Sequence, residues 1–454
     1  MNTRRRVRWI VLAALLLLTF ASRLCHLDIV WVEEAYPAAA AIQMSDYGKT
    51  IYQDFWFDKP PGAAYFYRLF DAQPGLPLRL AGTLFVFACA ILAYAAARKA
   101  WGEREGLTAA ALLVFSLTFD HPSAILAIAP DLLMVLPHLA ALCLLAYRRN
   151  IPAGIVTGIA FWINPKAAFL GAAGLLWSRS PAFAVSAAIT AAVLLAPVWQ
   201  GWWEQVIVWG RAYSADPPGP APVWEGVKQT GSWIWFHLTL VAGAAVAMSR
   251  GIQRRWTVVA MLLLSFCAVV LGLRFYPRYF FQLLPLMVIL AARGLWLTPV
   301  RYRCVLLGLL LIPGIRFGRQ YPVLAADLLA GRPHQWNQLS LADDSREVAT
   351  TLKNSAPGDT LFVWGYRPDV LMRTRMPLGA PYLDSQPLNG VLADRHLQSA
   401  KPSVHPVGDP RAIRATFVVD GLGLLNPALA FPAGDNYIEI ARTRYSILYR
   451  RRIQ

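Results

Sequence analysis

Two short motifs in the first connection after an apolar segment carry charged residues that a plain membrane anchor would not need. The first motif is the acidic pair Glu33-Glu34. A carboxylate held at a lipid–water boundary can act as a general base or as a metal ligand. Alternatively, one of the two acids caps a helix expected over residues 35–44, because carboxylates are favoured at a helix N-terminus.

The second motif is the run Asp58-Lys59-Pro60-Pro61-Gly62. Two consecutive prolines fix φ and remove two backbone donors, so Lys59 is expected on a stiff, extended segment. An ammonium group presented in this way suits the binding of a phosphate. The alternative is an ordinary turn with a solvated lysine.

Further charged residues recur later in the chain, beside or inside apolar segments. Asp131 lies among apolar residues, an expensive place for an acid unless it is partnered or functional. Lys166 lies at the predicted bend Asn164-Pro165-Lys166. By contrast, Asp120 and His121 are expected in an exposed turn.

The connection at 274–280 is both basic and aromatic. Its sequence is Arg-Phe-Tyr-Pro-Arg-Tyr-Phe, so Arg274, Arg278 and Tyr279 lie close together along the chain. Snorkelling towards the interface can account for one arginine. Two arginines with flanking tyrosines instead favour anion binding.

These charged residues need a membrane-embedded scaffold to position them. The composition is 57% hydrophobic and only 15% charged, against about 45–50% and 25% in a soluble domain. Uncharged apolar runs recur along the chain, and runs of about 18 or more residues can cross a bilayer. About eleven segments are expected, near residues 8–24, 78–98, 106–120, 124–147, 152–163, 167–177, 181–199, 231–249, 256–273, 279–298 and 302–316.

Basic residues predict the orientation of these segments. Arg4-Arg5-Arg6 precedes the first segment and places the N-terminus in the cytoplasm. The remaining inner connections are all basic if 152–177 forms a short hairpin bent at 164–166, where a proline disfavours a continuous helix. The acids and cations above then lie on the outer side of a plasma (inner) membrane.

The predicted fold is a multi-pass α-helical membrane protein with a small soluble C-terminal α/β domain. The membrane domain covers 1–316, with an outer catalytic loop at 26–77, and the extracytoplasmic domain covers 317–454. In the latter, a helix is expected over 343–353 and strands over 359–364, 415–420 and 445–449. The Trp-rich segment 200–230 suits a helix in the membrane interface.

The net charge of +17 sits mainly beside membrane segments, so it marks orientation and no nucleic-acid partner is expected. Acids and cations gathered on one side suit a lipid-linked phosphate whose head group is transferred. The main alternative is a transporter or flippase of lipid-linked sugars. Such a protein should show repeated halves and a polar path across the membrane, and the sequence shows no repeat. A non-catalytic scaffold is a third possibility.

Together these motifs resemble the GT-C type of membrane glycosyltransferase, which takes a sugar from a polyprenyl phosphate. The nearest branch contains protein-mannosyltransferase-like enzymes, lipid A aminoarabinose transferases and lipopolysaccharide-core galacturonosyltransferases. The residues that carry the resemblance are Glu33-Glu34-Ala35-Tyr36, Gly48, Lys59-Pro60-Pro61 with Tyr65 and Phe66, Asp131, Asn164-Pro165-Lys166, Arg278-Tyr279 leading to Pro285, and 362–366.

The resemblance implies an inverting transfer outside the membrane, with an undecaprenyl-phosphate sugar as donor and a lipid, glycan or protein as acceptor. Glu33 would then be the base or a metal-proximal acid, and Lys59 would contact the donor phosphate. Lys166 and Arg278 are further candidates for that contact. The family's first acid is usually Asp, whereas this chain has Glu33. A divalent cation such as Mg²⁺ or Mn²⁺ is left open as a cofactor.

Overall fold

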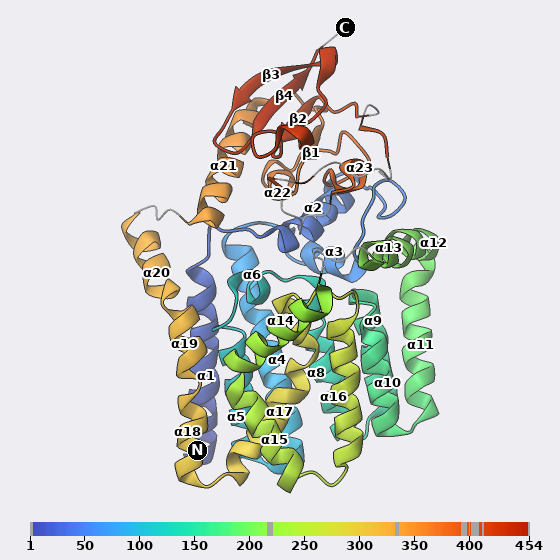
Figure 1. The fold of residues 1–454 in the computed structure, drawn as a ribbon. Coiled ribbons are helices and arrows are strands. Elements are labelled where there is room, and N and C mark those ends of the chain that lie inside the picture. The colour runs from blue at the N-terminus through green and yellow to red at the C-terminus, as the bar shows by residue number, and fades with distance from the viewer. Residues whose placement is uncertain are drawn as a thin grey trace. The chain divides into compact units, whose positions relative to one another are not determined.

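The computed structural model describes residues 3–215, 221–331, 336–391, 397–398, 400, 408–410 and 413–452 (Figure 1). The chain divides into two compact units. We call Met1–Leu27, Arg79–Trp199 and Arg211–Arg332 the helical unit. We call Asp28–Leu78, Gln200–Gly210 and Pro333–Gln454 the mixed unit. The division into a membrane domain, 1–316, and an extracytoplasmic domain, 317–454, remains a prediction.

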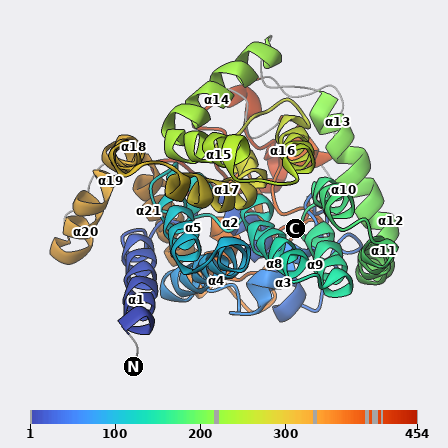
Figure 2. The same cartoon turned by 90° about the horizontal axis from the view of Figure 1, so that it is seen from below.

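The helical unit is built from apolar helices joined by short connections (Figures 1 and 2). Its helices, with those that continue from it along the chain, are α1 Thr3–Leu24, α4 Leu76–Trp101, α5 Glu103–Ser116, α6 Pro122–Ile125, α7 Pro130–Leu133, α8 Val135–Ala146, α9 Asn150–Ile163, α10 Ala167–Ser178, α11 Pro181–Leu195, η1 Ala196–Val198, α12 Trp199–Trp202, the π-helix η2 Trp203–Val208, α13 Trp209–Ala215, α14 Pro222–Phe236, α15 Leu238–Arg250, α16 Arg255–Val270, η3 Pro277–Gln282, α17 Leu284–Leu297, α18 Val300–Gly308, α19 Leu311–Gly318 and α20 Gln320–Ala330.

Three helical stretches in the described residues are long and apolar enough to cross a membrane: Arg5–Leu24, Leu76–Trp101 and Pro181–Ala215. The pair α14 and α15 would be a fourth if its 84° bend lies within one span. The other apolar helices are shorter. The predicted count of about eleven membrane segments therefore stays a prediction.

Helix breaks follow the sequence in some places and depart from it in others. The predicted bend is confirmed, because α9 ends at Ile163 and α10 begins at Ala167. The predicted segment 124–147 is interrupted near its start, because α6 ends at Ile125 and α7 and α8 then run as one apolar helix over Pro130–Ala146. Pro130 begins α7, where its missing N–H costs no intrahelical hydrogen bond.

Small residues allow the helices to approach closely. A Cβ atom added to Gly294 of α17 would lie 1.7 Å from the carbonyl oxygen of Gly243 on α15. Gly154 and Gly158 of α9, spaced by three residues, meet α11 in the same way. This spacing is typical of helix packing in membranes, where van der Waals contact replaces the hydrophobic effect as the driving force.

The mixed unit contains a four-stranded sheet with strand order β1-β2-β4-β3. β1 and β2 are parallel, and the other two pairs are antiparallel. Three strands were predicted, whereas β3 was missed. The elements are α2 Val32–Asp46, α3 Pro61–Arg68, α21 Asn337–Thr351, η4 Leu352–Asn354, β1 Leu361–Trp364, α22 Asp369–Thr374, α23 Gln386–Asn389, β2 Phe417–Asp420, η6 Pro427–Leu429, η7 Gly434–Asn436, β3 Tyr437–Arg442 and β4 Ile447–Arg451.

Hydrogen bonds join the first loop to the C-terminal region within the mixed unit. The Gln43 side chain donates to the carbonyl of Met376 (3.0 Å) and accepts from the amide of Leu378 (3.1 Å). The amide of Trp56 donates to the carbonyl of Pro381 (2.9 Å). Because Gln43 is fully buried, these bonds fix the loop that carries the predicted site residues against the C-terminal region.

Candidate active site

Helix α2 positions the acidic pair. The backbone N–H of Trp31 donates to Oε1 of Glu34 at 3.1 Å, and the Glu34 side chain is fully buried. Glu34 is therefore the acid that caps the helix, the alternative raised for this pair. Glu33 is half-buried in the first helical turn. Tyr36 lies three residues further on, so the two side chains share a face of α2.

Tyr36 joins this face of α2 to the second motif. Its ring stacks on that of Phe57 at 5.2 Å between centroids, and its hydroxyl hydrogen-bonds to Asp58. The Nζ atom of Lys59 lies 6.0 Å from the centre of the Tyr36 ring. The structure thus places Asp58 and Lys59 next to Tyr36, which lies one helical turn beyond Glu33.

Hydrogen bonds with two other residues hold the Asp58-Lys59 segment. The N–H of Phe57 donates to the side-chain oxygen of Gln205 (2.8 Å), and the Tyr52 hydroxyl donates to the carbonyl of Lys59 (2.6 Å). Pro61 then begins α3. The ammonium of Lys59 pairs with Asp58 at 2.7 Å, and 46% of the lysine side chain remains exposed.

The sequence interpretation missed a second carboxylate at this site, that of Asp384. Burial raises the pKa of Asp384 to about 7, and the negative charge of Asp58 contributes to the rise. A hydrogen bond from the Gln386 N–H and the positive charge of Lys59 act in the opposite direction. Burial, with the charges of Asp58 and Asp384, also raises the pKa of Tyr36 well above its ordinary value. In the sequence, Asp384 stands out only as an acid that directly follows the apolar pair Tyr382-Leu383. No neighbouring residue indicates that it lies near Asp58.

A second polar cluster, which we call the bend cluster, lies within the helical unit. Oδ1 of Asp131 accepts from Nδ2 of Asn164 (3.0 Å) and from Nζ of Lys166 (3.2 Å). The same Nζ lies 3.2 Å from the centre of the Tyr279 ring. The structure therefore brings together three predicted site residues: the acid that α7 presents, the cation at the bend and the aromatic residue of η3.

The two arginines of the basic connection have different surroundings. Arg274 is buried, donates to the carbonyl of Tyr213 at 2.7 Å, and lies 3.5 Å from the centre of that ring. Arg278 is half-buried, and its guanidinium lies 4.9 Å from the Tyr276 ring and 5.9 Å from the Tyr279 ring. Arg278 is thus the arginine that borders the bend cluster.

One expectation about this unit is wrong. Asp120 was expected in an exposed turn, but it is buried and lies 3.6 Å from Nε2 of His237. His237 stacks on Trp233 at the bend between α14 and α15. No spacing along the sequence links this pair, because Asp120 follows α5 and His237 precedes α15, far apart along the chain.

A metal ion would need several converging ligands. Across the residues that the structure describes, no group of three or more His, Cys, Asp and Glu side chains is arranged to hold one. Asp58 lies close enough to Asp384 for its charge to help raise the pKa of that carboxyl. Oxygen ligands of this type suit Mg²⁺ or Mn²⁺, although such ions usually bind with additional ligands.

Neither a protein-family model nor a curated protein sequence matches this chain. Solved structures do match. ArnT from Cupriavidus metallidurans, bound to undecaprenyl phosphate, superposes with a TM-score of 0.58 at 14% identity, over 99% of this chain and 98% of that one. The oligosaccharyltransferase AglB from Archaeoglobus fulgidus, in complex with an inhibitory peptide and a dolichol-phosphate, gives 0.53 at 12% identity, over 93% and 70%.

The arabinofuranosyltransferase AftD from Mycobacteria also matches, with a TM-score of 0.51 at 14% identity, over 99% of this chain and 42% of AftD. These three similarities share one feature, the fold of a membrane glycosyltransferase. The fold implied by the sequence resemblance is therefore confirmed.

Proposed function

We propose that the protein is an integral membrane glycosyltransferase that moves a sugar from a polyprenyl phosphate to an acceptor on the outer side of the membrane. One observation carries the proposal. A fold shared with ArnT bound to undecaprenyl phosphate holds an exposed lysine on a stiff segment, within the same unit as a half-buried glutamate. An ammonium and a carboxylate are the two groups that this transfer requires.

In the proposed reaction, Glu33 takes the proton from an acceptor hydroxyl. The hydroxyl oxygen attacks the anomeric carbon, and the bond from that carbon to the phosphate oxygen breaks. The electron pair leaves with the polyprenyl phosphate, whose added negative charge Lys59 stabilises. Attack opposite to the leaving group inverts the anomeric configuration. Asp58 orients Lys59 through their 2.7 Å ion pair.

The other candidates have secondary roles in this proposal. Glu34 caps α2 and so fixes Glu33 beside it. Asp131, Lys166, Arg274, Arg278 and Tyr279 stay predictions as substrate or catalytic residues. Within this proposal, Asp131 and Lys166 form a structural ion pair, and Arg278 is the most suitable of the five for a phosphate. The sequence left a divalent cation open as a cofactor, and Asp58 and Asp384 are the carboxylates that would hold one. The N-terminus is proposed to lie in the cytoplasm, and the mixed unit outside.

Mass spectrometry of cell-envelope glycans and glycoproteins tests this function, with and without the protein. We expect one sugar modification to disappear and its polyprenyl-phosphate donor to accumulate. In a reconstituted assay, the protein should release undecaprenyl phosphate from the glycosylated lipid when acceptor is supplied. A flippase of lipid-linked sugars would move the lipid between leaflets without releasing undecaprenyl phosphate, which distinguishes the alternative.

A further inference from the structure

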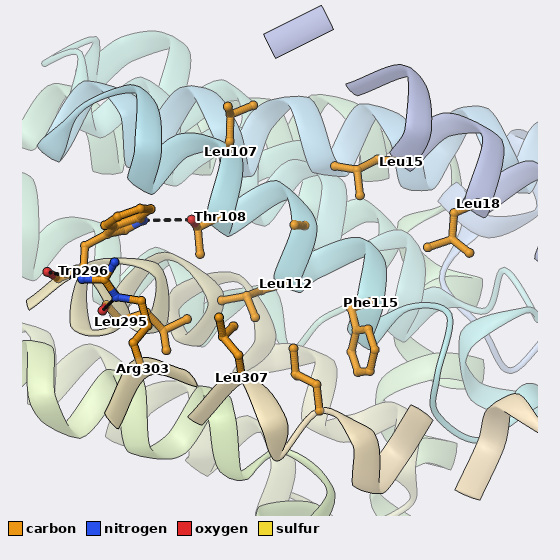
Figure 3. Close-up of a pocket in the computed structure, with 12 residues that line it drawn as sticks. Leu15, Leu18, Leu107, Thr108, Leu112, Phe115, Leu295, Trp296, Arg303 and Leu307 are labelled. Carbon is orange, nitrogen blue, oxygen red and sulfur yellow. Dashed lines mark hydrogen bonds between the residues drawn. The ribbon is translucent and has the colours of Figure 1, made fainter. Parts of the chain in front are cut away.

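The helical unit contains a cavity that the proposed reaction does not use. It has a volume of about 430 Å³, and its walls come from α1, α5, α17 and α18 (Figure 3). Leucine and phenylalanine side chains form most of the lining, among them Leu15, Leu112, Phe115 and Leu307. The volume lies within the range of about 300–1,000 Å³ typical of ligand sites, and an apolar lining favours an apolar ligand over water.

A cationic and aromatic group closes one end of the cavity. The indole N–H of Trp296 donates to the Thr108 hydroxyl at 3.0 Å, which fixes the ring (Figure 3). The Arg303 guanidinium lies 4.2 Å from the centre of this indole, and the Arg104 guanidinium lies 5.4 Å from it. Arg303 also donates from Nε to the carbonyl of Leu295 at 2.7 Å, and from Nη2 to the carbonyls of Thr298 at 3.0 Å and Trp296 at 3.4 Å. These bonds define its position and leave Nη1 for a ligand.

The charge at this end is positive. The two acids of the first turn of α5 already have arginine partners. Glu103 pairs with Arg98 at 2.9 Å, and Glu105 pairs with Arg293 at 2.9 Å. The two arginines on Trp296 therefore add positive charge that these acids do not balance.

The apolar wall of the cavity belongs to a helix suited to lipid. α1 is among the helices long and apolar enough to cross a membrane, and Leu18, which lines the cavity, is 37% exposed. Leu307 on the opposite wall is 42% exposed. A chain of methylene groups can therefore enter from the side without a polar barrier.

We propose that this cavity binds an anionic phospholipid, with one acyl chain among the leucines and the phosphate between Arg104 and Arg303. Basic pockets between membrane helices are the structural feature that recognises anionic lipid head groups. Guanidinium groups bind phosphate through charge-assisted hydrogen bonds. The sequence predicts that this end of the helices lies on the cytoplasmic side.

Native mass spectrometry of the purified full-length protein tests the site by titration with phosphatidylglycerol or phosphatidylcholine of identical acyl chains. We expect one phosphatidylglycerol to bind at least tenfold more tightly than phosphatidylcholine. Arg104→Gln should weaken it about fivefold, the effect of one basic residue near a head group. The matched control is Arg255→Gln, because Arg255 is also exposed and lies 5.3 Å from a Trp ring, that of Trp256.

A second variant tests the cavity without touching a charge. Ala111 lines it, so Ala111→Phe should fill the space and remove the tight phosphatidylglycerol site. Ala188→Phe, at an exposed position of α11, adds the same ring elsewhere and should leave binding unchanged. A melting temperature for each variant confirms that it is folded.

Three results would overturn the proposal. The first is equal binding of the two phospholipids, which would indicate non-specific annular lipid. The second is unchanged phosphatidylglycerol binding in both Arg104→Gln and Ala111→Phe. The third is displacement of phosphatidylglycerol by equimolar undecaprenyl phosphate, which would assign the cavity to the donor chain. None of these readouts requires glycosyl transfer, so this test is independent of the proposed function.

Discussion

Lys59 and Lys166 are chemically equivalent, but the two polar clusters that contain them balance charge differently. In the bend cluster, Lys166 meets one acid, an amide that supports this acid, and an aromatic ring, and its side chain is only 13% exposed. In the mixed unit, Lys59 pairs with Asp58 while the buried Asp384 lies near enough to sense both charges, and Lys59 is 46% exposed.

This difference separates a structural ion pair from a site that can accept a ligand. The contacts of Lys166 serve to hold the 164–166 bend against α7 and η3. Lys59 instead presents nearly half of its side chain to solvent, where it can meet a phosphate. A carboxylate with a raised pKa close to a charged pair is also typical of functional sites. We therefore expect mutations of the two clusters to affect different quantities.

The largest effect is expected for Glu33→Gln. Loss of a general base typically lowers the rate by about 10²–10⁴-fold. The glutamine keeps the size of the side chain, so the melting temperature should stay unchanged while kcat for sugar transfer falls by this factor. Glu225→Gln, an exposed acid on α14, is the control. Full transfer activity in Glu33→Gln would remove the base assignment.

Next in size is the effect of Lys166→Ala on stability. Removing the cation leaves the buried Asp131 carboxylate without its ion-pair partner, which we expect to cost about 3 kcal/mol of folding free energy. Thermal unfolding in detergent measures the loss. If Lys166→Ala melts like the wild type and loses donor affinity, the distinction between the two clusters fails.

Asp384→Asn should change how stability depends on pH. Because burial raises the pKa of Asp384 to about 7, the folded protein holds this proton up to about pH 7, whereas an aspartate ordinarily has a pKa of 3.8. The stability contribution of this group is therefore complete below about pH 4 and is lost as the pH rises through 7. At pH 8, the variant should be more stable than the wild type by on the order of 3 kcal/mol.

The measurement is the melting temperature of both proteins between pH 5 and pH 8. The wild type should lose stability across this range and Asp384→Asn should lose less. Asp435→Asn, which changes an exposed aspartate in the same unit, is the control and should follow the wild type. Parallel curves for wild type and Asp384→Asn would show that this carboxyl is ionised throughout.

The smallest expected effect is that of Lys59→Ala. A hydrogen bond to a charged group contributes about 1.5–3 kcal/mol, so donor affinity should fall roughly ten- to a hundredfold. Titration of the reconstituted protein with undecaprenyl phosphate measures it, and the melting temperature should change little because Lys59 is half-exposed. Unchanged affinity would exclude Lys59 from the phosphate site.

The sequence predicted the features that depend on local composition. Apolar runs identified most helices, and Asn164-Pro165-Lys166 identified the bend. It could not predict the 84° bend at His237, because no proline or glycine lies there and the buried contact is with Asp120, a residue distant in sequence. β3 was missed because four of its six side chains are exposed, including Glu439, which weakens the apolar signal.

The residues of the candidate site also fall into those that local sequence could identify and those that it could not. Residue type and neighbouring prolines were enough to select Lys59 and Asp58. Asp384 and Gln205 could not be selected, because they reach the Asp58 segment only through tertiary contacts of the C-terminal region and the Trp-rich segment. Periodicity and spacing contain no information about such contacts.

The most direct test of the account measures the lipid-linked donor in cells that carry either the wild-type protein or Glu33→Gln. Lipid extracts are analysed by mass spectrometry alongside the envelope glycans. We predict that Glu33→Gln, present in the membrane at wild-type level, accumulates a polyprenyl-phosphate sugar and lacks the corresponding glycan. Unchanged donor and glycan levels in that strain would contradict a transferase that uses this carboxylate.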